Sequence, residues 1–164
     1  MKLKTMLLLL LFMTFSITSL AADKAVGFKK INQKGDYFYY SGNVILKGKF
    51  DYSRAVDEND FAGDQVCFVP SEKYGTLIPR DKDDSRMPWF CFKNTRRAKD
   101  LLGLSDLLKN PKICEISGTA TVEIVNYVVD KRETETNDIA TLVKVINKSK
   151  LSTKNFSNDG QKCQ

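Results

Sequence analysis

The longest regular pattern in the chain is an alternation of apolar and polar positions between residues 38 and 52. Successive even positions carry apolar residues or glycine: Phe38, Tyr40, Gly42, Val44, Leu46, Gly48, Phe50 and Tyr52. The odd positions are mostly polar, with Ile45 as the exception. A period of two residues is typical of a half-buried β-strand, because successive side chains point to opposite faces. Glycine inside a strand marks a bend or a bulge. We therefore expect one long strand, bent at Gly42 or Gly48, that serves two sides of a small closed barrel.

Two short apolar segments follow, QVCFV over 65–69 and WFCFK over 89–93. They mirror each other about residue 79, so an antiparallel pair in this register places Cys67 opposite Cys91. Facing residues in such a pair have Cβ atoms about 5 Å apart, which is close to disulfide geometry. A slip of one residue would take the two cysteines out of reach. The register therefore predicts a cross-strand disulfide.

The period becomes helical over 94–109, where leucines recur at helical spacing after Ala98. Asn94 is a residue type favoured at a helix N-cap. Gly103 interrupts the apolar stripe, and Pro111 follows it. We expect one helix that breaks or ends at Gly103.

Two further strand patterns cover 114–129 and 139–146, on either side of a highly charged turn over 130–137. The inward face of the first consists of alternate apolar or small residues: Ile116, Gly118, Ala120, Val122 and Ile124. The order is thus three strands, a helix and two strands.

This order resembles the OB-fold, a five-stranded Greek-key barrel. The resemblance covers 37–147, rests on topology rather than on a short motif, and extends to small exported bacterial proteins of this kind. It implies ligand binding on the outer face of the first three strands and in the flanking loops. The rival architecture is another small β-barrel or a β-sandwich, and the single mid-chain helix favours the OB-fold.

The first 21 residues match the pattern of a secretory signal peptide. Lys2 and Lys4 form a basic start, an apolar run follows, and Ser19 and Ala21 place small residues at the −3 and −1 positions of a cut after Ala21. The apolar run is about 10 residues long, whereas a membrane anchor needs about 20. No later stretch is long and apolar enough to cross a membrane. We expect an exported bacterial protein that is periplasmic or secreted.

These patterns divide the chain into four parts. They are a signal peptide over 1–21, a polar leader over 22–36, one OB-like domain over 37–147, and a polar tail over 148–164 that Cys163 pins.

All four cysteines lie beyond the signal peptide, and an even number in an exported chain is typical of disulfides. The strand register pairs Cys67 with Cys91, which leaves Cys114 with Cys163. None lies in a CxxC motif, so zinc and thioredoxin-like redox sites are not indicated. The acidic loops lack the spacing of an EF-hand, and we predict neither a metal nor a cofactor.

Charge and composition weigh against several functional classes. The chain has 26 basic and 20 acidic residues and a net charge of +6, and removal of Lys2 and Lys4 leaves +4. The signs are interspersed, whereas a nucleic-acid binder usually has a denser basic patch. The absence of histidine excludes Ser-His and Cys-His nucleophile pairs. A carboxylate pair of the kind used in glycoside hydrolysis stays open, because acidic residues are numerous.

The candidate ligand contacts are aromatic and basic residues expected on the outer face of the barrel: Tyr39, Lys47, Lys49 and Trp89. Such a surface can stack a sugar, a base or a peptide side chain. The alternative is that Trp89 covers the disulfide and the tyrosines cover a barrel rim.

We expect no catalytic residue and interpret the chain as an exported, non-enzymatic binding module. Its expected partner is a protein, a peptide or a glycan of the cell envelope. The alternatives are a small cell-wall hydrolase with paired carboxylates and a single-stranded nucleic-acid binder.

Overall fold

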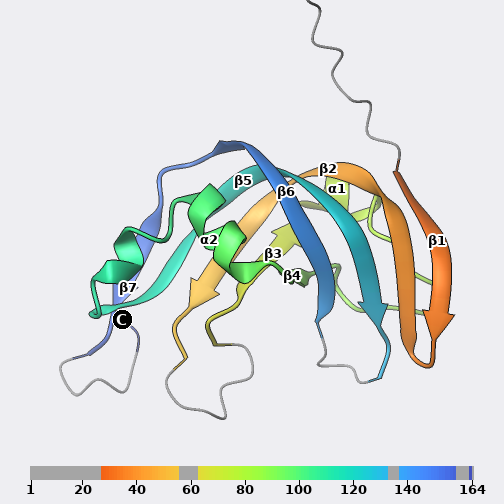
Figure 1. The fold of residues 1–164 in the computed structure, drawn as a ribbon, viewed down its shortest axis with the longest axis horizontal. Helices are drawn as coiled ribbons and strands as arrows, with labels where there is room; N and C mark the ends of the chain where they lie inside the picture. The colour runs from red at the N-terminus through yellow and green to blue at the C-terminus, as the bar shows by residue number, and fades with distance from the viewer. Residues whose placement is uncertain (1–26, 56–62, 133–136, 158–162, 164) are drawn as a thin grey trace, which may run out of the picture.

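The computed structural model describes residues 27–55, 63–132, 137–157 and 163, and the signal peptide expected over 1–21 lies outside these residues. The described residues form seven strands, two α-helices and one 3₁₀ helix (Figure 1). The strands are β1 (Gly27–Lys34), β2 (Tyr37–Ser53), β3 (Val66–Pro70), β4 (Phe90–Phe92), β5 (Ile113–Asp130), β6 (Asp138–Lys148) and β7 (Ser152–Asn155). The helices are α1 (Glu72–Gly75), α2 (Thr95–Leu102) and the 3₁₀ helix η1 (Leu107–Lys109).

The strands form one sheet in the order β1-β2-β3-β4-β6-β5-β7, and an additional pairing joins β2 to β5. This pairing closes a ring of five strands, β2-β3-β4-β6-β5, to which β1 and β7 are attached at the outside. β4 and β6 run parallel, and the other pairs run antiparallel. The prediction of a mainly β fold stapled by disulfides is confirmed.

The predicted alternation places the even positions of β2 in the core. Val44, Leu46, Phe50 and Tyr52 are buried, and the odd positions Lys47 and Lys49 are exposed. The two glycines lie where the backbone is irregular or crowded. Gly42 has φ +112° and lies within a register shift between β2 and β5. At Gly48, a Cβ atom would lie 2.2 Å from the carbonyl oxygen of Val69, so β3 can approach β2 only over a glycine.

The register predicted for the two short strands is also confirmed. Cys67 faces Cys91, and Phe68 faces Phe90. The rings of Phe68 and Phe90 lie 5.5 Å apart, and the ring of Phe90 lies 5.6 Å from that of Tyr127 on β5. Burial of such large aromatic side chains is the main source of stability in a core of this size.

β5 changes its inward face partway along. Val122 and Ile124 are buried at even positions, whereas Tyr127 and Val129 are buried at odd positions. Asn126, between them, has φ +52°, and the ladders to β2 and β6 shift register nearby. A bulge of this kind reverses the alternation and brings Tyr127 into the core.

The expected helix ends at Gly103, which adopts φ +76° and donates its backbone N–H to Asp100. This left-handed residue is a common way to end a helix. Asn94, however, makes no side-chain cap. Its amide instead donates to the carbonyl of Leu142 and accepts from the N–H of the same residue, which ties the start of α2 to β6.

The two segments predicted as a polar leader and a polar tail each contain a strand. β1 pairs with the first part of β2, and β7 pairs with the first part of β5. Their side chains are mostly exposed, so neither strand has the hydrophobic alternation that reveals a half-buried strand. Backbone hydrogen bonds to long neighbouring strands hold them.

Both predicted disulfides are present, Cys67–Cys91 and Cys114–Cys163. No helix within the described part of the chain is long and apolar enough to cross a membrane.

Candidate functional site

The strands β2, β3 and β4 present a common outer face, which we define as the side opposite their buried core residues. One row of register partners crosses this face from β5 to β6: Ser117, Asp51, Cys67, Cys91 and Ile139. Neighbouring strands lie about 4.8 Å apart, so the row measures about 19 Å. The disulfide lies at its middle, and its two cysteines are 7% and 4% exposed.

A first cleft lies on the β2 side of the disulfide and has a volume of about 460 Å³. Lys49, Asp51 and Val69 line it together with a short segment of β5, 117–119. Lys49 is the register partner of both Val69 and Thr119. The cleft therefore places an ammonium group, a carboxyl group and two hydroxyl groups above the backbone of two paired strands.

Among the carboxyl groups that the structure describes, that of Asp51 has a pKa raised by its environment. Desolvation by its neighbours is the larger cause, although the residue keeps an exposed surface, and the charge of Glu115 adds to it. Glu115 is the register partner of Ser53, two residues along β2, and accepts a hydrogen bond of 2.8 Å from Lys154.

A second cleft, of about 310 Å³, lies on the other side of the disulfide, between β4 and β6. Its floor includes Cys91 and Ile139. Polar and charged side chains surround this floor: Gln65, Lys93, Thr95, Asp130, Arg132 and Asn137. The two clefts thus provide hydrogen-bonding groups on both sides of the disulfide.

The structure gathers three of the four predicted contacts on this face. Lys47 and Lys49 are exposed on β2, and Trp89 is half-buried directly before β4, where it would be the next register partner of Val69. Tyr39 lies in the other half of β2, between β1 and the end of β5. At about 3.4 Å per residue it is about 27 Å along the strand from Lys47, so it does not belong to the same site.

The sequence reasoning missed the other residues of the two clefts. Ser117 and Thr119 lie on the outward positions of a predicted strand, so their alternation was a usable signal. Arg132 and Asn137 come from the turn between β5 and β6. Only the tertiary contact of that turn with β4 brings them to the site.

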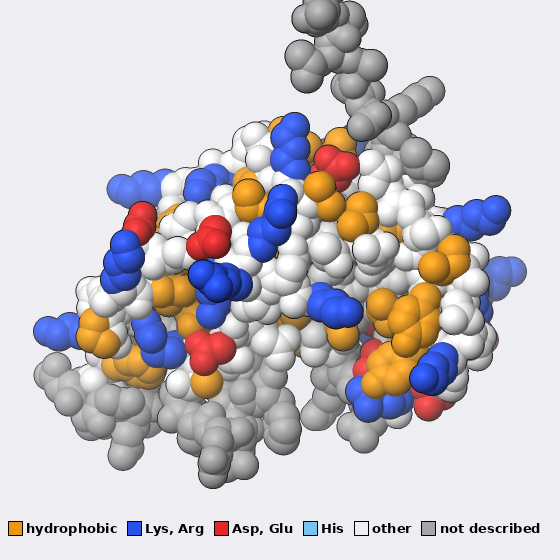
Figure 2. Space-filling model, viewed as in Figure 1, with side chains coloured by type: hydrophobic (Ala, Val, Ile, Leu, Met, Phe, Trp, Pro, Cys, Tyr) orange, Lys and Arg blue, Asp and Glu red, His pale blue; other side chains and the backbone are white. Residues whose placement is uncertain are grey.

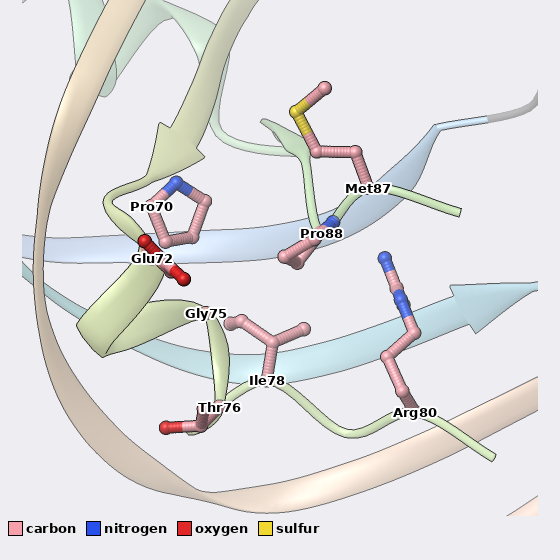
Figure 3. A pocket seen from close by; sticks show the side chains of 8 residues that line it. All are labelled: Pro70, Glu72, Gly75, Thr76, Ile78, Arg80, Met87 and Pro88. Atoms are coloured by element: carbon pink, nitrogen blue, oxygen red, sulfur yellow. The ribbon is translucent and has the colours of Figure 1, made fainter. Parts of the chain in front are cut away.

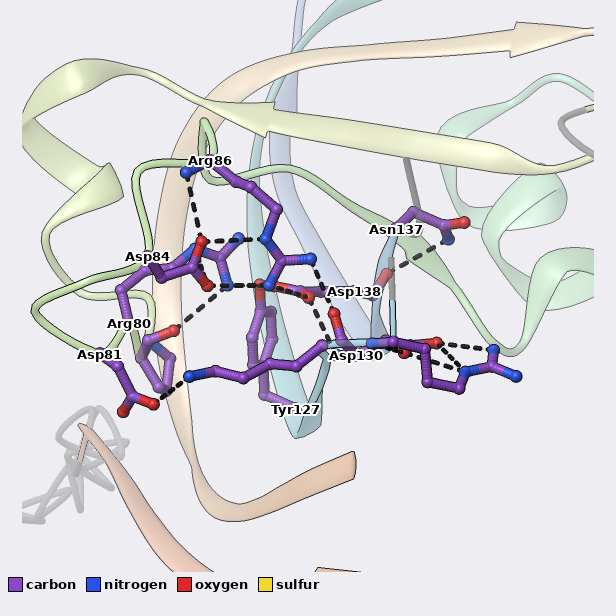
Figure 4. A network of polar contacts seen from close by, with 11 residues as sticks. Arg80, Asp81, Asp84, Arg86, Tyr127, Asp130, Asn137 and Asp138 are labelled. Carbon is purple, nitrogen blue, oxygen red and sulfur yellow. Dashed lines mark hydrogen bonds and ion pairs between the residues drawn. The ribbon is translucent and has the colours of Figure 1, made fainter. Parts of the chain in front are cut away.

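A network of charges lies where the β3–β4 connection meets the end of β5 and the start of β6 (Figure 4), and it shares Asp130 and Asn137 with the second cleft. Asp138, 1% exposed, accepts hydrogen bonds from the Tyr127 hydroxyl at 2.6 Å, from the backbone N–H of Asp130 at 3.2 Å and from Arg80. Arg86 binds both carboxylate oxygens of Asp84, at 2.9 and 2.8 Å.

Arginine hydrogen bonds favour the ionised form of two carboxylates of the network. The hydrogen bonds from Arg86 lower the pKa of Asp84 to about 2, and those from Arg132 lower the pKa of Asp130. A general acid needs a pKa raised toward neutrality, so these two aspartates are unsuited to that role. Two aspartates of the acidic β3–β4 connection, Asp81 and Asp84, form ion pairs with Lys131 and Arg86.

Charge on the visible surface is mixed. Figure 2 shows lysine and arginine side chains spread over one face of the molecule, with acidic side chains among them. Within the described residues, no group of three or more histidine, cysteine, aspartate or glutamate side chains is arranged to hold a metal ion.

Comparison with protein families, with curated proteins and with solved structures finds no match for this chain.

Proposed function

We propose that the protein is an exported, non-enzymatic binding module whose ligand lies on the outer face of β2, β3 and β4. The observation that carries this proposal is the gathering of Lys47, Lys49 and Trp89 on one face, with a polar cleft on each side of the disulfide. Concave sites with a few convergent polar groups are the usual ligand sites of proteins.

We further propose that the five-stranded ring is an OB-type barrel. Its strands β2 to β6 follow one another around the ring in the order 1-2-3-5-4, and α2 lies between the third and the fourth. OB-folds bind extended ligands on the face of their second and third strands and in the adjoining loops. In an OB-type barrel, the outer face of β2, β3 and β4 would lie at this position.

The proposed ligand is a peptide or a glycan of the cell envelope. Lys49, Asp51 and Thr119 offer donors and acceptors at strand spacing, and the indole of Trp89 offers an apolar plane. Polymers with regularly spaced amides or hydroxyls match such a row. The cross-strand disulfide would keep the row rigid in an oxidising compartment, outside the cell or in the periplasm.

The test is capture of envelope components by the mature chain with both disulfides intact. Lys49→Glu and Trp89→Ala should each lose the captured component, and Lys29→Glu, an exposed change on β1, should retain it. A reduced sample should bind less, because the two clefts adjoin the disulfide. Equal capture by all three variants would contradict the proposal, as would a Trp89→Ala variant that no longer shows a cooperative thermal transition.

One observation favours hydrolysis as a second candidate. Asp51, with its raised pKa, lies diagonally across from Glu115, as an acid and a base could. This alternative predicts a bell-shaped pH–rate profile on a cell-wall polymer and complete loss of turnover in Asp51→Asn. Binding without turnover would leave the binding module as the function.

A further inference from the structure

A third cavity, of about 600 Å³, lies within the connection between β3 and β4 (Figure 3). Its walls are largely apolar and come from both limbs of the connection. Pro70 and Ile78 belong to the first limb, and Met87 and Pro88 belong to the second. Gly75 and Thr76 also line it, and two charged residues complete the lining, Glu72 on α1 and Arg80. The volume is within the range of small-molecule sites, about 300 to 1,000 Å³.

The two limbs are fastened to each other and to the barrel. Arg80 and Arg86, one on each limb, both pair with Asp84, and Arg80 also bonds to the buried Asp138. Arg86 donates to the backbone carbonyl of Asp130 at 2.7 Å. Near α1 the limbs touch, since a Cβ atom on Gly75 would lie 3.1 Å from Pro88. The cavity is therefore shaped before a ligand arrives, which lowers the entropic cost of binding.

The charges at the cavity do not balance. The guanidinium of Arg80 is already neutralised by Asp84 and Asp138. Glu72 is exposed and makes no ion pair with any described residue. Figure 3 shows its carboxylate on the Pro70 side of the cavity, across from Met87 and Arg80. The one uncompensated charge of the lining is thus negative.

Met87 adds an apolar edge to the cavity that is exposed to solvent. Its side chain is 67% exposed, the largest value among the exposed large hydrophobic residues described. Methionine is flexible and adapts its shape to apolar ligands.

We propose that this cavity binds a small amphiphilic cation, with the apolar body between Ile78 and Met87 and the positive charge beside Glu72. The apolar walls account for the body of the ligand, and the unpaired carboxylate selects its charge. This ligand is inferred from the cavity lining and does not rest on the function proposed for the outer face.

The sequence supplies a specific reporter for the test. Of the four methionines, Met1, Met6 and Met13 lie in the expected signal peptide, so the mature chain has only Met87. Its ¹³C-methyl resonance can be followed by NMR while the oxidised mature protein is titrated with octylammonium, octanoate or 1-octanol, which share one chain and differ in charge.

Octylammonium should shift the Met87 signal saturably and bind about fivefold more tightly than octanol, with octanoate weaker still. Glu72→Gln should abolish the difference between octylammonium and octanol, and the matched control Glu115→Gln should preserve it. Absence of a saturable shift, equal affinity for octanoate, or an unchanged preference in Glu72→Gln would each overturn the proposal.

Discussion

The hydroxyl of Tyr127 donates a hydrogen bond of 2.6 Å to the carboxylate of Asp138, and both residues are buried. The bulge at Asn126 turns Tyr127 inward, and the start of β6 places Asp138 beside it. Arg80 reaches the same carboxylate from the β3–β4 connection. One buried charge therefore joins three segments that are distant in the sequence.

Tyr127→Phe should destabilise the protein by about 2 kcal/mol, because it removes a hydrogen bond to a buried charged group and leaves the ring in place. Urea unfolding monitored by Trp89 fluorescence would measure the change. Tyr39→Phe is the matched control, and its free energy of unfolding should change by less than about 0.5 kcal/mol, since no described residue bonds to its hydroxyl. Equal effects of the two changes would show that the Tyr127 hydroxyl contributes nothing specific.

The ion pair of Asp84 should make stability depend on pH at the acid end. The folded-state pKa of Asp84 is about 2, below the value of about 3.9 expected in the unfolded chain. The contribution is therefore complete above about pH 4 and is lost as the pH falls toward 2. At pH 6 we expect the free energy of unfolding of the wild type to exceed that of Asp84→Asn by about 1 to 2 kcal/mol.

This difference should shrink toward zero near pH 2, where a protonated aspartate resembles asparagine. Urea unfolding of both proteins across this range checks the sign. A difference that stays constant from pH 6 to pH 2 would mean that the ion pair with Arg86 does not stabilise the fold.

Gly48→Ala should cost about 3 kcal/mol, because the new methyl group meets a backbone carbonyl oxygen of β3 that cannot move without opening the sheet. Gly118→Ala is the comparison within the same ring. Its methyl group would approach the end of the Phe50 side chain at 2.9 Å. Because an aromatic side chain can shift more easily than backbone, we expect a cost of about 1 kcal/mol. Thermal and urea unfolding give both values, and the reverse order would refute the packing at Gly48.

The disulfide that closes the shorter loop, Cys67–Cys91, should contribute more to global stability than Cys114–Cys163, which closes the longer loop. Loop entropy alone assigns about 3.5 kcal/mol to Cys67–Cys91, whose cysteines are 24 residues apart, and about 4 kcal/mol to Cys114–Cys163, at 49 residues. Cys67–Cys91 lies within the ring, so its loss should lower global stability by about 3 kcal/mol. Loss of Cys114–Cys163 frees the tail in the native state as well, which offsets most of the entropy gained by the unfolded chain.

Paired alanine substitutions, followed by urea unfolding and amide exchange, separate these effects. The variant that lacks Cys114 and Cys163 should lose exchange protection in β7 while the ring keeps its own. A larger global loss in this variant than in the one that lacks Cys67 and Cys91 would contradict the expectation.

Local patterns were sufficient for the parts of the fold in which one face is buried. The alternation in β2 identified its core side chains, since a strand sorts its residues by parity wherever a core lies on one side. The mirror symmetry of the two short strands gave the pairing of Cys67 with Cys91, because register follows from the midpoint of the connection. Gly103 marked the end of α2 for an equally local reason, its tolerance of positive φ.

Other features depend on contacts between residues distant in the chain, and no local period encodes them. β1 and β7 are mostly exposed, so only hydrogen bonding to a longer strand makes them strands. Arg80 and Asp138 are 58 residues apart in the sequence, and each resembles an ordinary loop charge until the fold buries them together. The same reason joins Asp51 to Ser117. The odd or even position of a residue along a strand determines which face of the sheet its side chain occupies. Which side chains from different strands become neighbours on that face is determined only by the pairing of the strands in the closed ring.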